Sequence, residues 1–281
     1  MRPTDAVVDG HPSVDPWPSR LIRASRQRIR CELRVFLREP AAVGFTLAFP
    51  VMMLVLFGAV FNDTVPNTNV SYSQVYVAGI IAAGLLNVGV LALAIGIATE
   101  RDSGALKRLA GTPMPKAAYF VGKVGLVLTL SLAQIAVMLT IGRLMFGLHL
   151  PTDAGHWLTF AWVFVLGGAA ATLLGVAIGG LLPSAKSAPA ILNVPFVALQ
   201  FVSGVFIPFD QLPRWLYNVA GWFPLRWIGQ AMRSVFLPDS FRSVEPSGSW
   251  QHGRVLAVLV AWCVIGGLTA LRSFRWVGRE R

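Results

Sequence analysis

The sequence predicts an all-α polytopic membrane protein with six transmembrane helices, preceded by an amphipathic interfacial helix and interrupted by short re-entrant helices before the last span. Of 281 residues, 55% are hydrophobic and 13% are charged, whereas soluble domains carry roughly 25% charged residues. Six apolar runs are each near the ~20 residues that a helix needs to cross the hydrocarbon core. Such runs are expected to be helical, because lipid cannot satisfy backbone polar groups.

The first 39 residues are expected to lie outside the membrane domain. Residues 1–18 hold four prolines without apolar periodicity, so we expect a disordered cytoplasmic tail. An amphipathic helix is predicted over residues 19–39, with Ser19 as its N-cap and Pro40 after its end. Its apolar and basic residues recur on neighbouring faces: Ile22, Ile29, Leu33 and Phe36, and Arg23, Arg26, Arg30 and Arg34. The helix is expected either to lie on the membrane with its arginines at lipid phosphates, or to pack on a partner.

A transmembrane domain is predicted over residues 41–271. Its six spans are placed at about 41–61, 75–99, 118–142, 157–182, 188–207 and 255–271. Lys123 and Arg143 lie near opposite ends of the third span, where long side chains can snorkel to the interface. In the fourth span, small residues at every fourth position predict close helix packing within the chain: Gly167, Ala171, Gly175 and Gly179.

Lysine and arginine indicate the orientation, because they are enriched on the cytoplasmic side of membrane proteins. The N-terminal region, the loops after the second and fourth spans and the C-terminal tail together hold 17 of them, while the loops facing the other side hold five. We therefore expect a multi-pass protein of the cell (plasma or inner) membrane. Both termini, including a tail over residues 272–281, are expected in the cytoplasm.

The most charged stretch between spans predicts a short cytoplasmic helix within residues 100–115. Its acids precede its bases, as the helix dipole favours, and Pro113 and Pro115 end it. Leu106 and Leu109 share one side of the helical wheel. The charged side holds Glu100, Gly104, Lys107 and Arg108. A helix this short is unstable alone in water, so it needs a surface to pack against.

This stretch resembles a known family. The pattern E-R-x-x-G-x-L-K-R-L-x-x-T-P, followed by Gly122-Lys123, is similar to the loop between the second and third spans of ABC-2 type exporter permeases. In that family the segment is the coupling helix, which docks into a groove on a separate ATP-binding subunit. The resemblance implies that role for Glu100, Arg101, Gly104, Leu106, Leu109, Pro113 and Pro115. The alternative is an ordinary cytoplasmic loop with a solvated run of charges.

A second resemblance precedes the last span. The stretches S-G-V-F-I-P, Q-L-P and F-P-L, within residues 203–225, are similar to the ABC-2 region in which short helices dip back into the outer leaflet. Prolines and interfacial aromatic residues support a re-entrant segment over residues 208–237: Pro208, Pro213, Pro224, Trp215, Tyr217, Trp222 and Trp227. A plain outside loop with surface aromatic residues is the alternative.

The sequence predicts that this chain is not itself an enzyme and that it binds no cofactor. It has no G-x-x-x-x-G-K-[ST] motif, so ATP and Mg²⁺ are expected on a separate ATP-binding cassette subunit. The histidines and cysteines lack metal-ligand spacing, so no metal site is expected. Nucleic acid is not an expected partner despite a net charge of +11, because the basic residues flank apolar runs. No predicted span contains Asp or Glu, which disfavours a proton-driven carrier.

The resemblance therefore implies the permease subunit of an ATP-driven ABC-2 exporter, closest to the drug-resistance branch and its multidrug efflux. Two copies, a homodimer by expectation, would pair in membrane lipid. The second and fifth spans line the path in that family, which makes Asn87, Gln200 and Ser203 candidates for contact with an apolar or amphipathic, drug-like or lipid-like cargo. Interhelical hydrogen bonds are the alternative role for these residues. A self-sufficient carrier or channel and a non-transporting membrane scaffold are the alternative functions.

Overall fold

A computed structural model of the chain is built from helices, as predicted. It describes residues 17–61, 63–66, 68–148, 150–207 and 212–273. Within these ranges the extended pairing is limited to one bridge between Thr64 and Ser71. The predicted all-α membrane class is thereby confirmed. Most of the two predicted tails, residues 1–16 and 274–281, lies outside the described residues.

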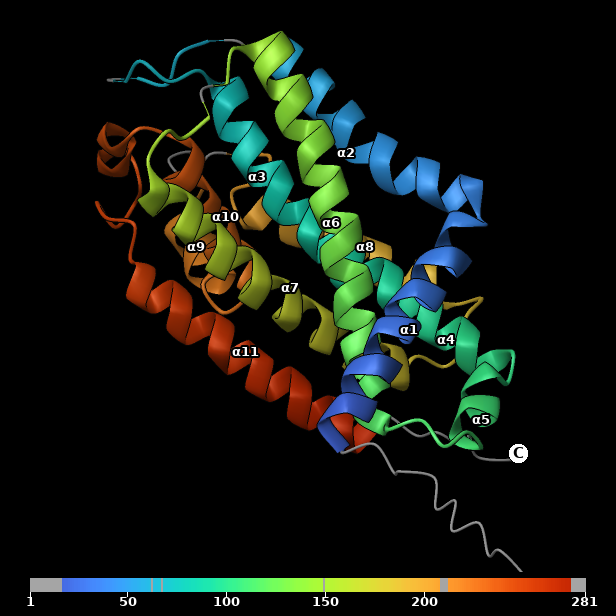
Figure 1. The fold of residues 1–281 in the computed structure, drawn as a ribbon. Helices are drawn as coiled ribbons and strands as arrows, with labels where there is room; N and C mark the ends of the chain where they lie inside the picture. Colours follow the sequence, from blue (N-terminus) through green and yellow to red (C-terminus); the bar gives the residue numbers. More distant parts are fainter. Residues whose placement is uncertain (1–16, 62, 67, 149, 208–211, 274–281) are drawn as a thin grey trace, which may run out of the picture.

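The helices follow one another along the chain with short connections (Figure 1). They are α1 (Trp17–Leu37), α2 (Pro40–Val60), α3 (Tyr72–Leu86), the π-helix η1 (Asn87–Ala92), α4 (Leu93–Asp102), α5 (Ala105–Ala110), α6 (Lys116–Phe146), α7 (Ala154–Leu181), α8 (Ala188–Val202), α9 (Arg214–Ala220), α10 (Pro224–Phe236), the 3₁₀ helix η3 (Asp239–Ser243) and α11 (His252–Ser273).

Five of the described helical segments are long and apolar enough to cross a membrane: α2, the continuous run α3–η1–α4, α6, α7 and α11. The fifth predicted span, residues 188–207, contains a helix of only 15 residues, α8. It ends at Val202 because the chain turns through Gly204, whose φ of 75° is left-handed and suits glycine best. At 1.5 Å per residue, α8 spans only about 22 Å.

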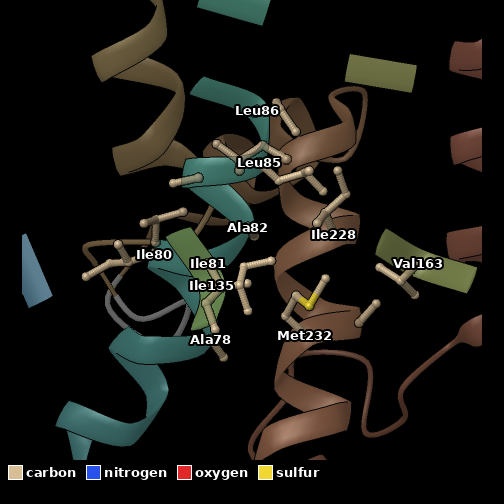
Figure 2. Packing of buried hydrophobic residues seen from close by; sticks show 14 of the residues in the cluster. Ala78, Ile80, Ile81, Ala82, Leu85, Leu86, Ile135, Val163, Ile228 and Met232 are labelled. Carbon is tan, nitrogen blue, oxygen red and sulfur yellow. The ribbon is translucent and has the colours of Figure 1, made fainter. Parts of the chain in front are cut away.

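The core lies where α10 packs back against the long helices. α10 contacts α3, α7 and α11, and all 13 of its residues are buried. Figure 2 shows Ile228 and Met232 of α10 facing Ile81 and Leu85 of α3, with Ile135 of α6 beside them. The predicted re-entrant segment 208–237 thus contains two helices, α9 and α10, after residues 208–211, which lie outside the described part.

The small residues of α7 form the predicted close packing. α7 contacts both η1 and α4. A Cβ atom added at Gly175 would lie 2.1 Å from the carbonyl oxygen of Gly89, and one added at Gly179 would lie 3.0 Å from that of Ala94. The backbones of the second and fourth spans therefore approach each other more closely than any side chain at these positions would allow.

α1 packs against the first turns of α6 rather than standing apart from the bundle (Figure 1). Gly122 and Gly125 of α6 make room for it, because a Cβ atom at either position would lie within 2.5 Å of the side chain of Arg28 or Ile29. The opposite side of α1 is exposed and carries most of its arginines: Arg20, Arg23, Arg26, Arg30 and Arg34. α1 begins at Trp17, before the predicted N-cap Ser19.

The two ends of the bundle differ in what they carry (Figure 1). We call one the α5 end, where α1, α5 and the start of α6 meet. We call the other the α9 end, where α9, α10 and η3 gather.

Candidate functional site

The charged segment at the α5 end is made of two helices. Glu100 and Arg101 belong to the last turn of α4, which ends at Asp102. Gly104 follows with a φ of 72°, a left-handed conformation that glycine adopts without strain. α5 then runs for six residues. The single helix predicted within residues 100–115 is therefore divided at Gly104, because one left-handed residue is enough to end a helix.

The apolar side of α5 packs onto the chain itself. Leu106 is 2% exposed and joins a buried cluster with Ile97 of α4 and Tyr119 of α6, and the half-buried Leu109 packs against the same cluster. The surface that the sequence analysis required for this helix is thus supplied by α4 and α6. What α5 presents outward is its other side, with exposed Lys107, Arg108 and Ala110.

The end of the segment follows from local hydrogen bonds. The Thr112 hydroxyl donates to the carbonyl oxygen of Leu109 at 2.7 Å, which closes the last turn of α5. Pro113 is exposed, and Pro115 stands at the N-cap of α6. Proline suits this place because it has no N–H that the start of a helix would leave unpaired.

Asp102 joins this segment to the loop after α7. Its Oδ2 atom accepts a hydrogen bond from the backbone N–H of Ala185 at 2.7 Å. Its Oδ1 atom lies 3.4 Å from the guanidinium of Arg101. The two loops predicted to be cytoplasmic, after the second and fourth spans, are therefore in direct contact.

Four charged side chains meet behind the segment, and we call them the ion quartet: Arg28, Glu32, Glu100 and Lys123. The Lys123 ammonium lies 2.9 Å from both carboxylate oxygens of Glu32 and also pairs directly with Glu100. Arg28 lies 2.5 Å from Glu32, one helical turn away. The Tyr119 hydroxyl donates to the second oxygen of Glu100 at 2.9 Å.

The ion quartet is largely buried, and no sequence pattern predicted it. The Lys123 side chain is only 3% exposed, so it is covered by protein and does not extend into solvent as a snorkelling lysine would. Two signals were present in the sequence, namely a lysine inside an apolar run and an Arg–Glu pair four residues apart. Their meeting depends on α1 folding back onto α6 across 91 residues of chain, which no local pattern indicates.

The three residues predicted to contact cargo lie in two neighbouring elements. Asn87 is the first residue of η1, while Gln200 and Ser203 lie at the end of α8, and η1 and α8 are in contact. Gln200 and Ser203 are buried, and Asn87 is half-buried. The Ser203 hydroxyl has no hydrogen-bond partner among the described residues.

The α9 end holds a second buried ion pair. The Arg233 Nε atom lies 2.5 Å from a carboxylate oxygen of Glu245, and both side chains are 3% exposed. This pair ties α10 to the segment that follows η3. Nearby, the guanidinium of Arg226 stacks 3.7 Å from the ring centre of Tyr217 in α9, and burial lowers the pKa of that guanidinium. The pair and the stack fix α9, α10 and the following loop to one another.

Comparisons with known proteins agree with this architecture. Residues 27–237 match the model of the family described as "ABC-2 type transporter". The chain is 27% identical over 249 residues to the "Putative transport permease ycf38" of Porphyra purpurea, with 83% of each chain covered. It is 25% identical over 185 residues to the "Probable multidrug ABC transporter permease YbhR" of Escherichia coli K12, covering 66% of this chain and 49% of that protein. It is 22% identical over 193 residues to the "Putative transport permease YvfS" of Bacillus subtilis, covering 69% and 77%.

Proposed function

Because the chain belongs to the ABC-2 type transporter family, we propose that it is the membrane-spanning permease subunit of an ATP-driven exporter. The proposal rests on how α5 is packed at the α5 end. There, a short helix is packed firmly onto two spans by Leu106 while it presents exposed Lys107 and Arg108 outward. If another protein binds a helix held in this way and displaces it, the spans that it packs on move with it.

The protein that displaces α5 is a separate ATP-binding subunit, since this sequence lacks the phosphate-binding loop of an ATPase. The charged side of α5 docks on that subunit, and its basic residues fit an acidic groove. Closure of the ATP-bound subunits tilts α5 and, through Leu106, moves α4 and α6. The cavity between two permease copies then switches from inward-facing to outward-open.

The cargo is an apolar or amphipathic molecule, of a drug-like or lipid-like kind. No acid lies inside the predicted spans, which disfavours a bare cation. A relative named as a multidrug permease supports the drug-like class. Gln200 and Ser203 supply polar contacts in the path, and the Ser203 hydroxyl has no partner within the described part of the chain.

Copurification from gentle detergent tests the proposal. The chain should retain an ATP-binding subunit encoded by the same cell, and the double variant Lys107→Glu with Arg108→Glu should lower its amount by about tenfold or more, equivalent to about 1.4 kcal/mol. The matched control is Arg242→Glu at the α9 end, which is also an exposed arginine and should retain the subunit fully.

Reconstitution separates the proposal from a self-sufficient carrier or channel. Proteoliposomes that hold this chain alone should show no cargo movement, with or without ATP inside. Adding the copurified subunit and ATP should start it. Transport by the chain alone, or equal retention of the subunit by the charge-reversed variant, would overturn the proposal.

A further inference from the structure

The ion quartet ties the end of α4 to α1 and α6, two helices that already pack against each other. A cavity of about 360 Å³, lined by residues of both helices, lies between α1 and α5. Beside this cavity, the charged groups of the quartet link α1, α4 and α6. Lys123 of α6 holds Glu32 of α1 on one side and Glu100 of α4 on the other, while Arg28 reaches both carboxylates.

Lys123 is the central member of the quartet. Its side chain is 3% exposed, against 7% for Glu32, 13% for Arg28 and 22% for Glu100. A buried charge is costly unless it is paired, and removal of one partner leaves the others uncompensated. Without Lys123, two carboxylates would face each other with only Arg28 between them, and like charges at short range repel. The positions of α1 and of the end of α4 therefore both depend on this one ammonium group.

Packing alone holds only part of this arrangement. α1 sits in the shallow site that Gly122 and Gly125 open on α6, which fixes its distance from α6 but does not by itself tie α1 to the end of α4. Glu100 lies in the last turn of α4, just before the break at Gly104, and its carboxylate contacts Lys123 and Tyr119 of α6. Fixing Glu100 therefore fixes the point from which α5 projects.

We propose that Lys123 is a positioning residue that makes α1, the end of α4 with α5, and the first turns of α6 into one rigid unit. A displacement of α5 then reaches α1, and through α1 the first span, instead of bending the chain at Gly104. The existence of the unit follows from the contacts alone. Its use as a lever rests on the proposed function, which supplies the force.

Hydrogen exchange of the full chain in lipid nanodiscs tests the unit without any partner. Lys123→Met should raise exchange at least about tenfold in both α1 and residues 100–111, while the core of α10 at the other end stays unchanged. Lys123→Arg should restore most of the protection, because it keeps a charge that can pair with both carboxylates. Arg143→Met is the matched control, since it removes an exposed basic residue from the same helix.

Glu100→Gln is the second variant, and it keeps the test decisive if Lys123→Met fails to fold. It removes the less buried carboxylate and leaves the Lys123–Glu32 pair in place. Exchange should therefore rise in residues 100–111 but not in α1. Unchanged protection in both variants, or equal loosening at both ends of the bundle, would overturn the positioning role.

A second arm adds the ATP-binding subunit. Lys123→Met should still retain the subunit, because the exposed side of α5 is intact, but the variant should no longer stimulate the ATPase activity of that subunit. If the exchange results hold and the chain retains no such subunit, the rigid unit stands and the proposed function falls. If the variant retains the subunit and stimulates it normally, the rigid unit does not act as a lever.

Discussion

Single residues decide how closely the spans of this protein approach each other. At Gly175 the nearest neighbour of an added Cβ atom is the carbonyl oxygen of Gly89, at 2.1 Å. Both groups in that contact belong to helical backbone, which cannot turn aside as a flexible side chain can. The contact therefore selects glycine at position 175 for its size.

We expect Gly175→Val to destabilise the protein by about 1–3 kcal/mol, the usual cost of overpacking a tight core. The thermal unfolding midpoint of the purified chain in detergent measures this. Gly96→Ala is the control in the partner span, because an added Cβ atom there has nothing within 4 Å. It should leave stability unchanged or raise it, since alanine favours a helix by roughly 1 kcal/mol over glycine. Equal midpoints for the two variants would show that the close approach is not a constraint.

The buried pair of Arg233 and Glu245 gives a second prediction at this scale. Glu245→Gln leaves the guanidinium buried without its counter-charge, which costs about 3–5 kcal/mol. The variant should unfold at a clearly lower temperature than the parent chain. Arg242→Gln, an exposed change three residues before Glu245, should unfold like the parent. If the two variants behaved alike, the pair would contribute nothing to the fixing of α10.

At the scale of elements, η1 determines how α4, the rest of the second span, is rotated about its helix axis. A π-helical turn holds one more residue than an α-helical turn would. That extra residue turns α4 about its axis by roughly 100° relative to a regular helix. Glu100 faces Lys123 and Leu106 meets Tyr119 in that rotated register.

Deleting Val90 from η1 should therefore separate insertion from coupling. The shortened span is still long enough to cross the membrane, so the variant should reach the membrane fraction. Rotation of α4 would also turn α5, so that Lys107 and Arg108 no longer face their present direction, and retention of the ATP-binding subunit should fall about tenfold or more. Val90→Ala keeps the residue count and should retain the subunit. Full retention after the deletion would mean that the register of α4 is unimportant.

A comparison of the predicted helices with the observed ones shows which features of this fold are local properties of the sequence. The long helices follow from apolar runs, and α1 from its periodicity, because both are local properties of the chain. The break at Gly104 and the end of α8 at Val202 were missed, since each depends on one left-handed glycine whose φ composition does not reveal. The packing of Leu106 inward was also missed, because a helical wheel shows which residues share a side but not what covers it.

At the scale of the whole molecule, the two ends carry different chemistry and should face different compartments. We expect the α5 end in the cytoplasm, as the distribution of lysine and arginine indicates. In a chain whose Cys31 and Cys263 are replaced by serine, an impermeant maleimide should label Ser103→Cys only after the cells are opened. Thr152→Cys, exposed at the opposite end, should be labelled in intact cells. The reverse labelling pattern would show that the α5 end faces the exterior, where α5 could not contact a cytoplasmic ATPase.

The shortness of α8 also bears on the lipid around the protein. Its 15 residues fall about 8 Å short of a ~30 Å hydrocarbon layer. Acyl chains beside it must compress to meet it, at a cost of fractions of a kcal/mol for each ångström of mismatch. Bilayers of short-chain lipid should accordingly meet the ends of α8 with less elastic strain than bilayers of long-chain lipid.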